Sequence, residues 1–123
     1  MNKQPRKLRP EADSSASKVI YVCHPFRGDP SGNRRRIAAV CRSLAAHGDT
    51  PIAPQLSVPE YLDESSEREL ALDQCLRVLE LVDEVWVYGN PTEGMKREIN
   101  AAKMNRIELR YLDRDGHMQS MPQ

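Results

Sequence analysis

The chain has 123 residues, of which 18 are Lys or Arg and 18 are Asp or Glu, so its formal net charge is zero. This length suggests one domain, and the balanced charge argues against a general nucleic-acid binder. The sequence shows no secretory leader and no apolar run of the roughly 18 residues that a transmembrane helix needs. Its three cysteines lie far apart and no metal-ligand spacing is present, so we expect no metal site and a cytoplasmic protein with reduced thiols. For the reasons above, we also expect no membrane and no nucleic-acid partner.

Two polar segments enclose a core in which strand and helix patterns alternate. Residues 1–17 are rich in Lys, Arg and Ser and are expected to be disordered, and residues 114–123 are expected to form a flexible end. In chain order, the expected elements are a strand over 18–23, a helix over 31–48, a short strand over 50–54, a loop over 54–66, a helix over 67–82, a strand over 84–89, a helix over 93–105 and a strand over 106–112.

This alternation predicts one α/β domain over residues 18–113, with a parallel sheet of about four strands covered by helices. The expected strand order is 2-1-3-4. In such sheets, ligands bind beyond the carboxyl ends of the strands, at the point where the strand order reverses. A ligand site is therefore expected between the first and third strands, enclosed by the loops 24–32 and 89–94.

Glu98 is a carboxylate near the expected site. Thr92 can cap the helix that starts at residue 93, and Met95, Ile99 and Ala102 form the apolar stripe of that helix. Glu98 falls at the margin of this stripe, where partial desolvation would raise its pKa and suit it to nucleophilic or acid–base work. The alternative is a surface glutamate paired with a nearby Lys or Arg.

Four segments carry a family resemblance: VIYVCHPFRGD at 19–29, APQL at 53–56, YLDESSERELAL at 61–72 and, most specifically, VDEVWVYGNPTEGMKREINAAK at 82–103. They resemble the nucleoside 2-deoxyribosyltransferase-like superfamily, and within it a branch of small phage and bacterial proteins that form a domain of unknown function. The spacing Gly94-x-x-x-Glu98 is similar to the superfamily's glycine followed, after three residues, by the catalytic glutamate. The resemblance covers about residues 18–112.

The resemblance implies a flavodoxin-like three-layer sandwich that acts on a small-molecule nucleoside or nucleotide without a cofactor. Glu98 would attack C1′ of the sugar, the base would depart, and water or a second base would resolve the glycosyl ester, as in retaining glycosidases. Tyr21 would be a second catalytic residue, because an aromatic hydroxyl near the ribose is a family feature. Related enzymes are dimers or larger, so the resemblance is compatible with a homo-oligomer.

The same resemblance implies which residues bind the substrate. The turn after the first strand would enclose the sugar or its 5′ end, through His24, Pro25, Phe26, Arg27 and Gly28. Thr92 and Gly94 would approach the sugar or a phosphate at a helix N-terminus, which attracts anions. Arg27 and Arg68 could hold a phosphate, although Arg27 is equally compatible with a surface residue. His24 is expected to be exposed, and Cys23 to be a buried, unreactive thiol, because no base is evident near it.

One position departs from the family pattern. The characterised enzymes carry an Asp eight residues ahead of the position matching Asp83, and Cys75 stands there. Asp73 lies two residues earlier, which turns it about 200° away around the helix. The candidates to replace the missing carboxylate are Asp63, Glu64 and Glu67. The alternative function is thus a noncatalytic nucleotide-binding or sensing module. A cytokinin-forming phosphoribohydrolase is less favoured, because residues 89–98 lack the glycines of PGGxGTxxE.

Overall fold

The computed structural model describes residues 17–118, and the expectations for residues 1–16 and 119–123 lie outside this range. Its elements are β1 (Val19–Cys23), α1 (Pro30–Ala46), β2 (Thr50–Ile52), two 3₁₀ turns (Pro54–Leu56 and Val58–Glu60), α2 (Arg68–Leu79), β3 (Glu84–Tyr88), α3 (Glu93–Met104) and β4 (Glu108–Leu112). Every expected strand and helix is present, with ends shifted by three residues or fewer. None of the helices in residues 17–118 is long and apolar enough to cross a membrane.

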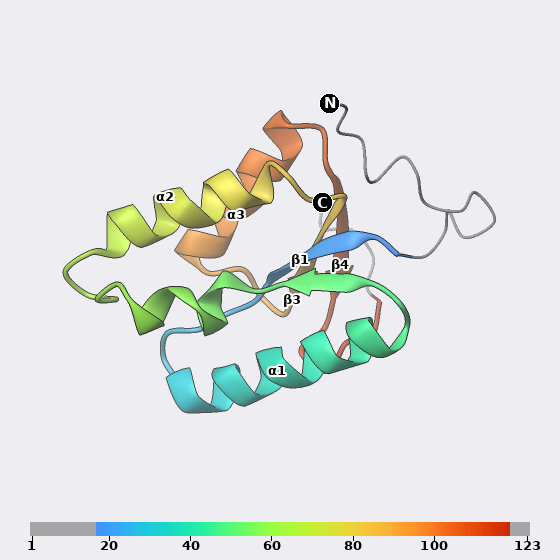
Figure 1. Cartoon of the computed structure of the whole chain (residues 1–123), viewed down its shortest axis with the longest axis horizontal. Coiled ribbons are helices and arrows are strands. Elements are labelled where there is room, and N and C mark those ends of the chain that lie inside the picture. The colour runs from blue at the N-terminus through green and yellow to red at the C-terminus, as the bar shows by residue number, and fades with distance from the viewer. Residues whose placement is uncertain (1–16, 119–123) are drawn as a thin grey trace, which may run out of the picture.

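The four strands form one parallel sheet in the order β2-β1-β3-β4, which confirms the predicted topology. Helix α1 covers one face of the sheet, and α2 and α3 lie together on the other (Figure 1). The result is the expected three-layer α/β sandwich. After β4 the chain turns through residues 113–117, and Met118 pairs antiparallel with Leu112.

The alternation of side chains along β1 decides which of its residues face α3. Successive residues of a strand point to opposite faces of the sheet. Ile20 and Val22 accordingly pack in the apolar cluster that contains Ile37 of α1. Tyr21 and Cys23 pack on the other side, in the cluster with Met95 and its neighbours from α3. The hydroxyl of Tyr21 and the thiol of Cys23 therefore lie on the face that Glu98 also approaches.

Candidate active site

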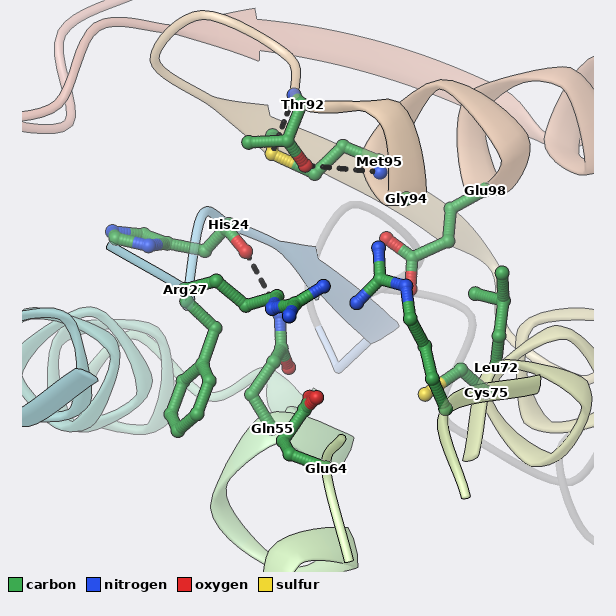
Figure 2. A pocket seen from close by; sticks show the side chains of 12 residues that line it. His24, Arg27, Gln55, Glu64, Leu72, Cys75, Thr92, Gly94, Met95 and Glu98 are labelled. Atoms are coloured by element: carbon green, nitrogen blue, oxygen red, sulfur yellow. Dashed lines mark hydrogen bonds between the residues drawn. The ribbon is translucent and has the colours of Figure 1, made fainter. Parts of the chain in front are cut away.

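A pocket of about 140 Å³ lies at the carboxyl end of β1 and the amino end of α3 (Figure 2). Segments far apart in the sequence line it. They are the turn after β1, the first 3₁₀ turn, the turn before α2, α2 itself and the first two turns of α3. Its lining residues are His24, Phe26, Arg27, Gln55, Glu64, Arg68, Leu72, Cys75, Thr92, Gly94, Met95 and Glu98. Three of the predicted site residues are outside this set: Tyr21, Pro25 and Gly28.

The position of α3 brings Glu98 into the pocket from above the end of β1. Thr92 caps this helix, since its hydroxyl accepts a hydrogen bond from the Met95 main-chain N–H at 3.3 Å. Glu98 follows three residues after Met95 and is only 6% exposed, which is deeper than the marginal position expected from the helix pattern. The alternative of a surface glutamate paired with Lys or Arg is therefore wrong.

Two donors from β1 satisfy the buried Glu98 carboxylate. The Tyr21 hydroxyl donates to Oε2 at 2.6 Å, and the Cys23 thiol donates to Oε1 at 3.2 Å. Cys23 is buried, as expected. The reason given from the sequence, that no base lies near its thiol, is wrong, because the fold brings Glu98 against it. Sequence reasoning could have found this contact, since Cys23 lies two residues after Tyr21 and hence on the same side of the strand.

Burial dominates the electrostatics of these three groups. It raises the pKa of Glu98, and the hydrogen bonds from Tyr21 and Cys23 oppose part of that rise. Burial, together with the charge of Glu98, raises the pKa values of Tyr21 and Cys23 well above their ordinary ranges. Both groups therefore remain protonated donors over the physiological range, and the carboxylate is the group in this cluster that can act as a nucleophile.

The raised pKa of Glu98 predicts a pH-dependent stability. A carboxyl whose pKa is raised by folding is protonated in both the folded and the unfolded chain below its unfolded pKa, and its contribution to the free energy of unfolding is greatest there. This contribution is lost as the pH rises from the unfolded pKa through the folded pKa. The total loss is about 1.4 kcal/mol for each unit by which folding raises the pKa. The free energy of unfolding of the wild type, compared with that of Glu98→Gln, should thus fall between mildly acidic and neutral pH. Urea titrations over this range measure it, and a pH-independent difference would contradict it.

Cys75, at the position where the family resemblance predicts an Asp, lies near Tyr21 and Glu98 on the pocket wall. Burial, with the charge of Glu98 beside it, raises the pKa of the Cys75 thiol to about 11. The thiol is therefore neutral at physiological pH and does not replace the charge of a carboxylate. Asp73 is exposed and is not part of the pocket.

Among the other acidic candidates, the fold brings one into the pocket. Glu64 lines it, and its Oε1 atom is buried without a hydrogen-bond partner among residues 17–118. Asp63 instead accepts hydrogen bonds from the main-chain N–H groups of Ser65 and Ser66, and Glu67 accepts one from the N–H of Asp63. These two carboxylates stabilise the turn before α2, so Glu64 is the one of the three that lines the pocket.

The expectation of an exposed His24 is wrong, because its side chain is buried, with 2% exposed. The ring packs against Tyr88 with 5.8 Å between centroids, and its Nδ1 donates to the Pro25 carbonyl at 2.8 Å. Figure 2 shows the ring directed away from Glu98. The main-chain carbonyl of His24 accepts a hydrogen bond from Gln55 Nε2 at 3.3 Å, so Gln55 supports the turn after β1. No sequence signal beyond the APQL segment pointed to Gln55.

Comparison with known proteins agrees with this architecture. The model of the family described as Domain of unknown function (DUF7768) matches residues 18–112. None of the curated proteins matches the chain.

Two solved structures share the fold. The 2-deoxyribosyltransferase of Bacillus psychrosaccharolyticus is 16% identical, with a TM-score of 0.65 over 83% of this chain and 77% of that one. The 2-deoxyribosyltransferase of Leishmania mexicana is 14% identical, with a TM-score of 0.61 over 78% of this chain. The match spans 64% of the Leishmania chain, less than two thirds of its length. The chain thus belongs to the DUF7768 family and has the fold of the 2-deoxyribosyltransferases.

Proposed function

We propose that this protein cleaves or transfers the N-glycosidic bond of a nucleoside or nucleotide, with Glu98 as the nucleophile. The observation that carries the proposal is the buried Glu98 carboxylate in the pocket, held through both oxygens by Tyr21 and Cys23. The fold shared with two 2-deoxyribosyltransferases supports the choice of substrate class. Glu98 forms no ion pair with any described residue, and burying an unpaired carboxylate costs free energy. Such a group is typical of functional sites.

The reaction would proceed as a double displacement at C1′ of the sugar. A Glu98 oxygen forms a bond to C1′ while the C1′–N bond breaks, and the bonding electrons leave with the base nitrogen, which takes up a proton. Water or a second base then attacks C1′ and releases the Glu98 carboxylate from the ester. Each carboxylate oxygen has two lone pairs, so an oxygen that accepts from Tyr21 or Cys23 still has one for the attack.

Glu64 is the group we propose as the proton donor to the leaving base. It lines the same pocket as Glu98, and its buried Oε1 has no hydrogen-bond partner in the part of the chain that the structure describes. A carboxyl in its acidic form can donate to the departing nitrogen and, as a carboxylate, can activate the incoming water. His24 is less suited to this step, since its ring is turned away from the pocket (Figure 2) and burial lowers its pKa.

Cys75 favours a second candidate function, which is nucleotide binding without catalysis. A neutral thiol stands where the family resemblance predicts a carboxylate, so the site would have fewer charged groups to orient a sugar. The two functions differ in one observable: the binding module would be stabilised by a nucleotide and would release no base from it.

The proposal is tested by incubating the protein with 2′-deoxynucleosides and their 5′-monophosphates and measuring free base by chromatography. Acid-quenched samples are digested and analysed by mass spectrometry for a sugar adduct on the peptide that contains Glu98. Free base together with this adduct is the expected result. Free base with the adduct on another residue would overturn the role of Glu98. A panel that gives no base, while one nucleotide raises the melting temperature, would overturn catalysis and support the binding module.

Tyr21→Phe should shift the pH dependence of base release. The Tyr21 hydrogen bond lowers the pKa of Glu98, so its loss should raise that pKa and move the acidic limb of kcat/KM to higher pH. At a pH below the limb, the rate should fall about tenfold for each unit of the shift. Tyr61→Phe is the matched control, because Tyr61 is exposed and contacts Gln74. Equal losses at all pH values would contradict the prediction.

A further inference from the structure

We infer that the outer face of α2 binds a second copy of this chain, with the two α2 helices packed antiparallel about a two-fold axis. The inference stands on the residues of this face and does not rest on the proposed function. A two-fold interface needs a surface that complements itself, because both copies present the same residues to each other.

Large apolar side chains are exposed around α2. Leu70, on the helix, is 47% exposed, and Leu81, two residues after its end, is 72% exposed. Tyr61 is also exposed and lies beside them, because its hydroxyl donates to Gln74 of α2 at 2.9 Å. The only other large apolar side chains exposed within residues 17–118 are Met104 and Met118. This concentration around one helix is typical of an interaction surface.

The spacing along this face is that of a helix that packs against another helix. Four residues form the stripe, separated by four, three and four positions: Leu70, Gln74, Arg77 and Leu81. The Leu81 main-chain N–H donates to the Val78 carbonyl at 2.9 Å, so the helical path continues to the end of the stripe.

The stripe complements itself when the second copy runs antiparallel. Its midpoint falls between Gln74 and Arg77, so Leu70 would pack against the partner's Leu81. Asp73 would come level with the partner's Arg77, and the two-fold axis would repeat both contacts. A parallel pairing would instead place Asp73 beside Asp73 of the partner subunit, which is repulsive.

Asp73 and Arg77 are both available for pairing between copies. They are exposed, and neither forms an ion pair or a hydrogen bond within residues 17–118, although their spacing of four would allow one. Glu69 is already paired with Arg97 of α3 at 3.2 Å, and Glu80 lies further from the midpoint, at the end of the helix. One charge of each sign near the midpoint favours a second copy over an acidic or a basic partner.

The pairing leaves the pocket open. Arg68, Leu72 and Cys75 line the pocket from the opposite side of α2, which packs beside α3 (Figure 1). A contact made mainly by one helix of 12 residues, about 18 Å long, buries less than a standard interface. We therefore expect a dissociation constant in the micromolar range.

The test is the mass of the full chain, measured by sedimentation equilibrium over a series of micromolar concentrations. The wild type should approach the mass of two chains as the concentration rises. Arg77→Asp, Asp73→Arg and Leu81→Lys should each raise the dissociation constant at least about tenfold, because the two-fold axis doubles each loss. An equimolar mixture of Arg77→Asp and Asp73→Arg should associate about as tightly as the wild type, because each copy then supplies the charges that complement the other.

Met104→Lys is the matched control, because Met104 is an exposed apolar residue at the end of α3, and this variant should associate as the wild type does. Circular dichroism checks that each variant is folded. A wild type that stays monomeric throughout the series would overturn the inference, as would a dimer that survives all three substitutions. Single charge variants that dissociate and do not associate when mixed would overturn the antiparallel pairing. Base release plays no part in these measurements, so the interface and the proposed function fail separately.

Discussion

Glu98→Gln should reduce the rate of base release by at least about a thousandfold, because an amide cannot form the ester bond to C1′. Glutamine has nearly the same shape, and its carbonyl oxygen can still accept the Tyr21 hydrogen bond seen at 2.6 Å. The neutral amide also avoids the cost of burying a charge, so the variant should fold with at least the wild-type melting temperature at neutral pH. Initial rates of base release, measured beside thermal unfolding, check both expectations.

The matched control for this substitution is Glu93→Gln, on the same helix. Glu93 is exposed and interacts with Lys96, three residues further along α3. Its replacement should leave the rate of base release close to that of the wild type. A Glu98→Gln variant that retains a rate within tenfold of the wild type would contradict the nucleophile role, whatever its stability.

Glu64→Gln should slow the release of ordinary bases by about a hundredfold, the lower end of the range for general acid catalysis. It should have little effect on 7-methyl-2′-deoxyguanosine, because that base is already cationic and departs without receiving a proton. Glu98→Gln should block the release of both kinds of base. The comparison of the two substrates therefore separates the proton donor from the nucleophile, and it is made with the same chromatographic assay.

The matched control here is Glu80→Gln, since Glu80 is an exposed residue at the far end of α2 from Glu64. A hundredfold loss on both substrates in Glu64→Gln would indicate a role in sugar positioning in place of proton donation. No loss on either substrate would leave Glu64 outside the reaction.

Local patterns were sufficient for the architecture. The apolar, β-branched runs at residues 19–23 and 84–88 mark buried strands, and the stripe of Met95, Ile99 and Ala102 marks the buried side of α3. The expected strand order was confirmed as well, since the sheet has the order β2-β1-β3-β4. The candidate nucleophile came from the resemblance, through the spacing from Gly94 to Glu98.

The environment of each candidate was decided by the tertiary structure. Burial of Glu98 depends on donors 77 and 75 positions away in the chain, which are Tyr21 and Cys23. The direction of the His24 ring depends on packing against Tyr88, which belongs to β3.

The acidic residues before α2 also show which features could be predicted from the sequence and which depend on the tertiary structure. Local sequence was enough to predict the strands, the helices and their order. It also showed that several carboxylates precede α2. Tertiary structure alone decided that Asp63 and Glu67 stabilise the turn while Glu64 enters the pocket. The physical reason is that periodicity records which face of an element is buried, whereas burial, pKa and hydrogen-bond partners depend on atoms that folding brings together from distant parts of the chain.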